Sequence, residues 1–480
     1  MQAPPIVFDN SYAHLPDRFH AKLPPTPVAK PALLRVNVDL ARELGIDPHW
    51  LASADGVATV AGNALPPGAE PLAMAYSGHQ FGHWSGQLGD GRAILLGETI
   101  GRDGKRYDIH LKGSGRTPFS RGGDGRAAIG PVLRELVVSE AMHRLGVPTT
   151  RVLSAVMTGE AVLRQDGPLP GAVLARVARG HVRVGTFEHF ASREDRDGLT
   201  ILTDYAIRRF DPELAALGPD RVLAFFDAVI ARTAKLIAQW QCLGFIHGVM
   251  NTDNVTISGE TIDYGPCAFM DVYDPDTVFS SIDHGGRYRY SNQPRIGHWN
   301  MARFAQCLLA IVEGDGKAAV EAAQTKLDAF PVLFEQAWLS GMRRKFGLLT
   351  AQDGDRELVE AFLALLAETK ADFTNSFRLL CDGLTLDGFA AWRTAWLERR
   401  AREDVLPEAQ RTAMLGANPA FIPRNHRVEA ALAAAQEGNL APFDELMDVL
   451  KAPYDDRPEY ADYKTPPAEH EIVQATFCGT

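Results

Sequence analysis

The pattern of hydrophobic and polar positions divides the chain near residue 180. Before that point, between Tyr76 and Lys112, glycines separate short apolar runs. Two of these runs, AILLGETI and RYDIHLKG, are typical of strands, and the turn residues Arg102–Gly104 lie between them. The later segments VLSAVM and GAVLARVA have the same strand-like pattern. This part of the chain therefore predicts a small sheet.

Helical patterns are rare before residue 180 and dominant after it. Pro131 opens one early helix, PVLRELVVSEAMHRLG, which Gly146 closes. A long helix is predicted in RVLAFFDAVIARTAKLIAQWQCLG, where apolar residues recur at helical spacing up to Gly244. The segments NVTIS and TIDYG predict a short β-like pair, and helix follows helix from Trp299 to about residue 450.

These patterns predict an α+β fold with four parts. Residues 1–70 are Pro-rich and are expected to be irregular, with one short helix near Asn37–Leu44. Residues 71–178 are expected to form a small β-rich lobe with one key helix, and residues 179–450 a large helical lobe. Residues 451–480 are expected to form an irregular tail. A β-rich lobe followed by a helical lobe is the order found in protein kinases, which predicts a kinase-like two-lobed fold.

Composition and charge narrow the function. A length of 480 residues exceeds one compact core and agrees with two lobes. The net charge of −11 argues against a general nucleic-acid binder. A signal peptide and an apolar run of about 18 residues are both missing from the sequence, so we expect a cytoplasmic protein outside the membrane. A monomer is expected, although the sequence says little about oligomeric state. Five scattered cysteines without a CxxC pair predict neither a zinc site nor a disulfide framework.

The segment HGVMNTDN (residues 247–254), followed by the triplet Asp263-Tyr264-Gly265, carries the clearest chemical pattern. Protein kinases combine a His-x-Asp-x-x-x-x-Asn loop with an Asp-Phe-Gly triplet on the next hairpin. Asn254 and Asp263 occupy the two positions that supply oxygen ligands to Mg²⁺. An Asx-rich turn before a hairpin would explain either segment alone. Their combination after a long helix favours a metal site.

The same loop departs from the kinase pattern at one position. Val249 stands where kinases have their catalytic Asp, and an aliphatic side chain cannot accept a proton from a hydroxyl group. Asp253 is the nearest carboxylate that can do so. The sequence therefore predicts Asp253 as the general base and argues against ordinary kinase chemistry.

Lys112, at the end of a predicted strand, is a candidate phosphate ligand. In kinases a strand-borne Lys contacts phosphates and pairs with a helix Glu. Glu135 and Glu140 both lie on the following helix, and periodicity does not choose between them. A solvated lysine is the alternative interpretation.

Glycines and arginines near the predicted cleft suit a polyphosphate. In GQLGDGR, Gly89 and Gly91 would let backbone N–H groups approach phosphate, and Arg92 adds a planar cation. A tight hairpin explains this segment equally well. Six further arginines bracket the cleft, and about half of them are expected to be solvated: Arg116, Arg121, Arg126, Arg176, Arg179 and Arg183.

Cys478 lies two residues before the chain's last position. An inert thiol is the favoured interpretation, since terminal segments are often loosely ordered. A redox switch that pairs it with Cys267 is the alternative.

Longer segments resemble a known family. They are NSYAHLP, YSGHQFG, LGDGRA, HLKGSGRTPFSRGGDGRA, LRELVVSEAMHRLGVPTTR, HGVMNTDN, IDYGPCAFMD, NQPRIGHWNMARFAQCL and NPAFIPRNHRVEAAL. Together they look like the selenoprotein O family, protein adenylyltransferases with a kinase-like fold, and the resemblance covers nearly the whole chain.

The resemblance implies that ATP binds flipped relative to kinases, so that AMP passes to Ser, Thr or Tyr hydroxyls of proteins and pyrophosphate leaves. It implies a need for Mg²⁺ or Mn²⁺, self-modification, and UMP transfer from UTP with Mn²⁺ in some bacterial members. By motif, nucleotide contacts fall on Gly89, Gly91, Arg92, Lys112, Asp124, Gly125, Arg176 and Arg183. Glu135 would pair with Lys112, Asn254 and Asp263 would hold the metal, and Asp253 would accept the proton.

Two other functions remain open at this point: an ordinary kinase-type phosphotransferase and a non-catalytic ATP-binding scaffold. Val249 argues against the first, and the intact set of Lys112, Asn254 and Asp263 argues against the second. Relatives carry a selenocysteine or cysteine near the C-terminus. Here Cys478 is followed by Gly-Thr, and DVYDPDTVFSSID contains no partner cysteine, so an intramolecular disulfide is not expected.

Overall fold

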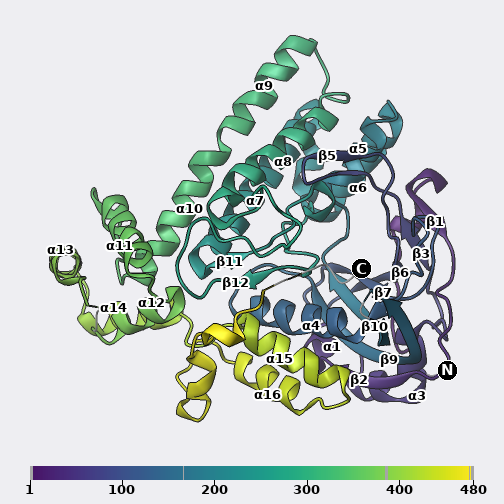
Figure 1. Ribbon diagram of the computed structural model, residues 1–480. Helices are drawn as coiled ribbons and strands as arrows, with labels where there is room; N and C mark the ends of the chain where they lie inside the picture. Colours follow the sequence, from purple (N-terminus) through teal and green to yellow (C-terminus); the bar gives the residue numbers. More distant parts are fainter. Residues whose placement is uncertain (1–3, 166, 384–386, 475, 477–480) are drawn as a thin grey trace.

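The computed structural model describes residues 4–165, 167–383, 387–474 and 476. An antiparallel sheet lies to one side and a large group of helices to the other (Figure 1). The strands are β1 His20–Lys22, β2 Ala32–Val36, β3 Leu72–Met74, β4 Gly78–Gln80, β5 His83–Ser85, β6 Ala93–Ile100, β7 Arg106–Lys112, β8 Ala127–Ala128, β9 Arg151–Arg164, β10 Gly167–Ala178, β11 Phe245–Ile246 and β12 Ala268–Phe269.

Helices make up most of the chain after β10. The helices are α1 Val38–Glu43, α2 Pro48–Ala52, α3 Ala54–Ala61, α4 Ile129–Arg144, α5 Val184–Ala191, α6 Arg196–Phe210, α7 Arg221–Leu243, α8 Gln293–Leu308, α9 Gly316–Asp328, α10 Phe330–Lys345, α11 Asp355–Thr369, α12 Phe373–Cys381, α13 Ala390–Arg400, α14 Pro407–Ala417, α15 Asn425–Gln436 and α16 Ala441–Leu450. In the described part of the chain, none of these helices is both long and apolar enough to cross a membrane.

The main sheet has the strand order β1-β3-β6-β7-β10-β9-β2, with β8 beside β10. The hairpin predicted around Arg102–Gly104 is confirmed, since β6 and β7 pair from Ala93 opposite Lys112 to Ile100 opposite Arg106. The strands β9 and β10 confirm the two later strand predictions. Both faces of this sheet are covered, because side chains alternate between the faces and the consecutive residues Ala93 to Thr99 of β6 are all buried.

α4 covers one face of the sheet and is itself covered by α15 and α16 (Figure 1). It begins at Ile129, two residues before the predicted Pro131, and ends before Gly146, whose φ is +81°. Because the sheet and two helices surround it, α4 is apolar on most sides rather than along one stripe. The charged side chains that it does bury are therefore candidates for a polar site.

The prediction that residues 1–70 are irregular apart from one helix is wrong. This segment supplies the edge strands β1 and β2, and α1, α2 and α3 cover the second face of the sheet. The predicted helix near Asn37 is confirmed as α1, which Asn37 caps by accepting the Leu40 N–H. The other elements have three to eight residues, too short for periodicity to reveal, and packing on the sheet stabilises them.

The helical part is built around α7, which confirms the long predicted helix and ends at Gly244 with φ +70°. The chain then enters β11 and the loop from His247 to Asn254. The predicted strand pair NVTIS and TIDYG is wrong. Thr256 and Thr261 make only isolated bridges, to Arg183 and Thr149, and the short strands β11 and β12 pair instead.

Candidate active site

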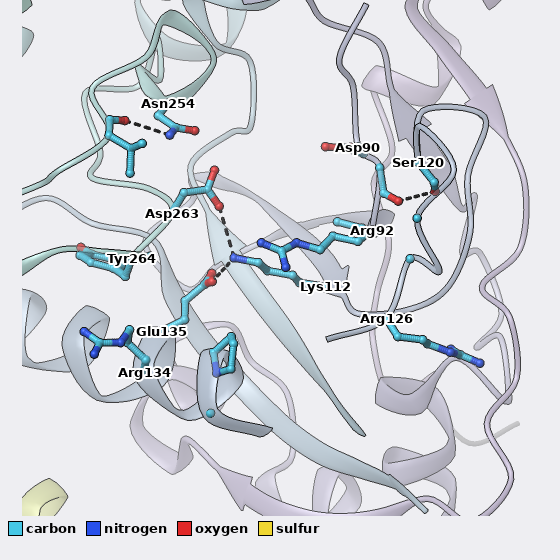
Figure 2. A pocket seen from close by; sticks show the side chains of 18 of the residues that line it. Asp90, Arg92, Lys112, Ser120, Arg126, Arg134, Glu135, Asn254, Asp263 and Tyr264 are labelled. Atoms are coloured by element: carbon cyan, nitrogen blue, oxygen red, sulfur yellow. Dashed lines mark hydrogen bonds and ion pairs between the residues drawn. The ribbon is translucent and has the colours of Figure 1, made fainter. Parts of the chain in front are cut away.

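A cavity of about 1270 Å³ lies between the sheet with α4 and the loops that follow β11. Its lining includes every residue that the sequence predicted for the site: Gly89, Gly91, Arg92, Lys112, Asp124, Gly125, Glu135, Arg176, Arg183, Asp253, Asn254 and Asp263. Figure 2 shows Asn254 and Asp263 on one side of this cavity and Asp90, Arg92 and Arg126 on the other. The fold thus gathers residues that lie up to 174 positions apart in the sequence.

The Lys112–Glu135 ion pair joins the sheet to α4. Lys112 ends β7, and Glu135 lies on the face of α4 that packs against the sheet. Glu140, the alternative partner, instead forms an ion pair with Arg151 at 2.8 Å. The choice between Glu135 and Glu140, which periodicity left open, is therefore resolved by the direction in which each side chain leaves the helix.

Asp263 is the carboxylate on which the cations converge. Its Oδ1 lies 2.7 Å from Arg176 Nη1 and 3.3 Å from Lys112 Nζ, and its Oδ2 lies 3.1 Å from Arg183 Nη1. Burial alone would raise the pKa of Asp263, but Arg176, Lys112 and Arg183 hold it well below its ordinary value. Asp263 is therefore ionised at neutral pH.

The backbone of Asp263 adopts a left-handed conformation with φ +64°, which is uncommon for a residue other than glycine. The Gly265 N–H donates to the Asp263 carbonyl at 3.0 Å, and the three cations hold the side chain. Local strain of this kind persists where the surroundings fix it, and it clusters at functional sites.

Asp253 has a different environment from Asp263. It is 7% exposed, and its Oδ1 has no hydrogen-bond partner in the described part of the chain. Burial raises the pKa of Asp253 to about 6, against the lowering effect of Arg183 and a hydrogen bond from Gln80. One carboxylate in the cavity is thus firmly ionised, whereas the other is poised near neutrality, as suits a group that accepts a proton.

This raised pKa predicts a gain in stability for Asp253→Asn. The folded value of about 6 exceeds the ordinary 3.8, so ionised Asp253 destabilises the fold above about pH 6 and has no such effect below about pH 4. At pH 8 in EDTA we expect the free energy of unfolding to rise by up to about 3 kcal/mol, and at pH 4 to stay unchanged. Urea unfolding of the wild type and the variant at pH 8 and pH 4 measures this difference in the free energy of unfolding. An Asp253→Asn variant that is destabilised equally at both pH values would contradict the raised pKa of Asp253.

His247 and Asn254 fix the loop between them. His247 is buried, and its Nε2 lies 2.8 Å from the Ile262 carbonyl, which ties the loop to the residue before Asp263. The Asn254 Nδ2 donates to the Val249 carbonyl at 2.9 Å, so the amide oxygen is the atom left for a ligand. Val249 itself is 4% exposed.

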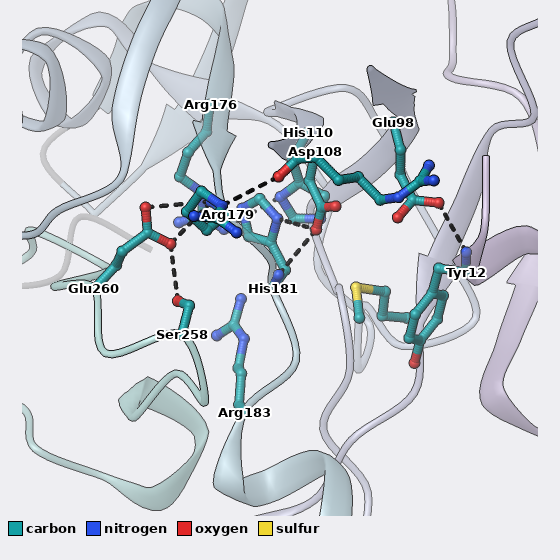
Figure 3. A network of polar contacts seen from close by, with 12 residues as sticks. Tyr12, Glu98, Asp108, His110, Arg176, Arg179, His181, Arg183, Ser258 and Glu260 are labelled. Carbon is teal, nitrogen blue, oxygen red and sulfur yellow. Dashed lines mark hydrogen bonds and ion pairs between the residues drawn. The ribbon is translucent and has the colours of Figure 1, made fainter. Parts of the chain in front are cut away.

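Behind the cavity, a buried chain of polar groups supports Arg176 (Figure 3). Arg176 Nη2 lies 3.2 Å from His110 Nδ1, and His110 Nε2 lies 2.9 Å from Asp90 Oδ2. Since Asp90 accepts a hydrogen bond, the His110 proton lies on Nε2 and its Nδ1 accepts from Arg176. Neither His110 nor Asp90 was predicted as a site residue, although both lie beside predicted ones in the motifs LGDGR and DIHLK.

The cavity has a surplus of positive charge in a chain of net charge −11. Its eight cationic residues are Arg92, Lys112, Arg121, Arg126, Arg134, Arg164, Arg176 and Arg183, and its six acidic ones are Asp90, Asp124, Glu135, Asp253, Asp263 and Glu429. Such a local excess of guanidinium groups suits a polyanionic ligand.

Two of the six bracketing arginines lie outside this lining. Arg116 donates to the carbonyls of Gly122 and Gly123. The Arg179 backbone N–H donates to Glu260 at 2.9 Å (Figure 3), and its side-chain Nε donates to the Arg106 carbonyl at 3.3 Å. The other four line the cavity, and among the six arginines Arg116 and Arg121 are exposed whereas Arg176 and Arg183 are buried. Arg164, which the sequence did not single out, pairs with Asp124 at 2.9 Å.

The backbone of the glycine-rich segment at Gly89 and Gly91 packs closely against Phe119. Gly89 has φ +95°, and a Cβ there would lie 2.5 Å from the Phe119 ring, while one at Gly91 would lie 2.8 Å from the Phe119 carbonyl oxygen. Larger residues at these positions would push the segment away from residue 119. Cys478, favoured as an inert thiol with a redox pairing to Cys267 as the alternative, lies outside the described residues, whereas Cys267 is described and buried.

Comparison with known proteins identifies the family. The model of the family described as protein adenylyltransferase SelO matches residues 5–451, and the chain belongs to this family. The resemblance seen in the sequence motifs is thereby confirmed.

Curated relatives extend over the whole chain. The protein nucleotidyltransferase YdiU of Nitrobacter hamburgensis is 54% identical over 493 residues, covering 100% of this chain and 97% of the relative. Those of Rhizobium rhizogenes and Rhizobium etli (strain CIAT 652) are 55% and 56% identical over 495 and 491 residues, and cover 98% and 97% of the relatives.

Proposed function

We propose that the chain is a protein adenylyltransferase that moves AMP from ATP to Ser, Thr or Tyr hydroxyls of proteins and releases pyrophosphate. It does so on a kinase-like scaffold in which residues 71–178 form a β-rich lobe, residues 179–450 a helical lobe, and residues 451–480 a tail. Family membership and the printed name of the relatives, protein nucleotidyltransferase, support a protein acceptor.

The observation that carries the proposal is the placement of carboxylates in the loop from His247 to Asn254. Val249 fills the kinase base position with an aliphatic side chain, and Asp253, with one oxygen free of hydrogen bonds and a pKa of about 6, is the carboxylate that lines the cavity there. The general base thus lies four positions further along the loop than in kinases. Such a shift suits a nucleotide bound in the flipped pose implied by the family, in which the α-phosphorus rather than the γ-phosphorus faces the acceptor.

The proposed ligands of the triphosphate are three cations that form ion pairs with two carboxylates, Glu135 and Asp263, in the structure. Lys112, Arg176 and Arg183 together carry one more charge than Glu135 and Asp263, so they can bind phosphate oxygens without losing their support. Gly89, Gly91, Arg92, Asp124 and Gly125 would form the rest of the nucleotide site, with Arg164 orienting Asp124.

A divalent cation fits the donor set. Asn254 offers an amide oxygen and Asp263 a carboxylate, the hard oxygen ligands that Mg²⁺ and Mn²⁺ prefer. In the described part of the chain, no group of three or more His, Cys, Asp or Glu side chains could hold a metal by itself, which suits a cation that also takes phosphate oxygens and water. When bound, it would neutralise charge on the phosphates.

In the proposed chemical step, Asp253 takes the proton of the acceptor hydroxyl and pyrophosphate is the leaving group. The acceptor oxygen bonds to the α-phosphorus, its proton passes to the Asp253 carboxylate, and the bond from the α-phosphorus to the bridging oxygen breaks. Pyrophosphate leaves with that electron pair, and its charge is stabilised by Lys112, Arg176 and Arg183. By family resemblance we extend the proposal to self-modification and to UMP transfer from UTP with Mn²⁺.

The nucleotide product tests this proposal. AMP transfer predicts pyrophosphate in proportion to modified protein and no ADP, whereas phosphoryl transfer predicts ADP and no pyrophosphate. Chromatography of the nucleotide products, with pyrophosphate measured by an enzyme-coupled assay, separates the two. Turnover that yields ADP would reject the proposal in favour of an ordinary phosphotransferase.

A further inference from the structure

The hairpin formed by β4 and β5 is docked onto the loop that carries Asp253. Three hydrogen bonds join them: the His79 N–H to Thr252 Oγ1 at 2.7 Å, Gln80 Nε2 to Asp253 Oδ2 at 3.0 Å, and the Phe81 N–H to Asn251 Oδ1 at 3.0 Å. Three consecutive hairpin residues thus contact three consecutive loop residues. These three hydrogen bonds fix the hairpin and the loop relative to each other.

The turn of this hairpin contains Phe81, which suits contact with the loop better than it suits the backbone conformation of the turn. Phe81 and Gly82 both have positive φ, +52° and +86°, as the common two-residue hairpin turn requires. Asn or Gly at position 81 would satisfy the turn without strain, whereas Phe does not. The Phe81 N–H instead bonds to Asn251, and its ring packs against Tyr288 with centroids 5.1 Å apart.

A second set of hydrogen bonds holds His79 of the hairpin to Thr252 of the loop and to Glu188 of α5. The Thr252 hydroxyl accepts from the His79 N–H and donates to Glu188 Oε2 at 2.5 Å. Glu188 Oε1 in turn lies 2.6 Å from His79 Nδ1. These bonds anchor the hairpin on both sides of Gln80 without involving the Gln80 side chain.

Asp253 has little room to move in this arrangement. A Cβ at Gly78 would lie 2.8 Å from Asp253 Oδ1, and one at Gly185 would lie 3.2 Å from the Asp253 Cα. The backbone of the hairpin and the start of α5 therefore enclose the residue. Within this enclosure, Gln80 donates to Oδ2, and Oδ1 is left without a hydrogen-bond partner among the described residues.

We propose that Gln80 is a positioning residue that holds the Asp253 carboxylate in the orientation in which it accepts the proton of the acceptor hydroxyl. This inference rests on the proposed function, because it assigns Gln80 a role through the general base. Both residues line the cavity, so the anchored carboxylate is presented to bound substrate. A carboxylate held in one orientation reacts faster than one that must reorient.

The test compares Gln80→Leu with His83→Ala. Leu removes the donor and keeps the bulk, whereas His83 is exposed on the same hairpin, directly opposite Gln80 in β5. Label from α-phosphate-labelled ATP is followed into denatured casein. We expect Gln80→Leu to lower the rate at saturating ATP by roughly 10- to 100-fold and to leave the KM for ATP within about twofold. We expect His83→Ala to match the wild type within about twofold.

A second comparison separates positioning from a structural role. In an Asp253→Asn background, Gln80→Leu should lower the remaining rate by no more than about twofold, because the residue through which it acts is already disabled. Gln80→Met, which also lacks the donor, replaces Leu if the first variant melts early.

The outcomes are distinct. Wild-type activity in Gln80→Leu, or an equal fall in the Asp253→Asn background, would overturn the inference and leave the proposed function standing. A wild-type enzyme that transfers no α-label would overturn the proposed function, and this inference with it.

Discussion

Replacing Asp253 with alanine is expected to lower AMP transfer by about 100- to 10,000-fold, the usual contribution of a general base. Nucleotide binding should survive, because the contact from Arg183 Nη1 in this loop goes to the Asp253 backbone carbonyl at 2.7 Å and not to its side chain. The removed carboxylate also carries a cost of burial, so the variant should remain folded.

Two measurements check this expectation together. Initial rates of α-label incorporation give the loss of transfer, and calorimetric titration with a non-hydrolysable ATP analogue gives the affinity, expected within about threefold of the wild type. Asp253→Asn, which has the same shape, should be equally inactive. A variant with wild-type turnover would show that another group accepts the proton.

Asp263→Asn is the second change with a large expected effect. It removes the charge that neutralises Lys112, Arg176 and Arg183 and weakens the proposed metal site. We expect transfer to fall by at least about 100-fold at saturating ATP and Mg²⁺. We also expect the metal-free protein to lose about 2 kcal/mol of stability at pH 7, since buried cations are left partly uncompensated.

The pH dependence of that stability loss has a definite sign. The pKa of Asp263 is depressed in the folded protein, so its stabilising effect is present above the ordinary value of 3.8 and fades as the pH falls. The difference between wild type and Asp263→Asn should therefore shrink in acid, as measured by urea unfolding. Asp276→Asn, at an exposed acid on the following segment, is the control expected to show neither effect. A loss of stability independent of pH would contradict the charge argument.

The long, strongly patterned elements of this fold were predictable from the sequence, and the short ones were not. The helix α7 and the β6–β7 hairpin carry their own periodicity and turn residues. The strands β1 and β2 and the helices α2 and α3 have three to eight residues and depend on packing against the sheet, which no local pattern records. The same holds for the loop around Thr256, where the pairing partner is Arg183, far away in the sequence.

The candidate site shows a similar division. Motifs indicated Asp253, Asn254 and Asp263, because their spacing matches a kinase-like loop and the triplet after it, and Lys112, because it ends a predicted strand before a helix that carries glutamates. The residues that orient them were missed, since their roles arise only from contact across the fold. Gln80 is 173 positions from Asp253, and His110 is 66 positions from Arg176.

Under the proposed function the α-phosphorus of ATP is the atom attacked, and ATP labelled at two different positions distinguishes this from attack at the γ-phosphorus. The purified chain is incubated with Mg²⁺ and denatured casein, once with ATP labelled in the α-phosphate and once with ATP labelled in the γ-phosphate. We expect label on protein only from the α-position, and loss of that label in Asp263→Asn. Protein labelled only from the γ-position would contradict it.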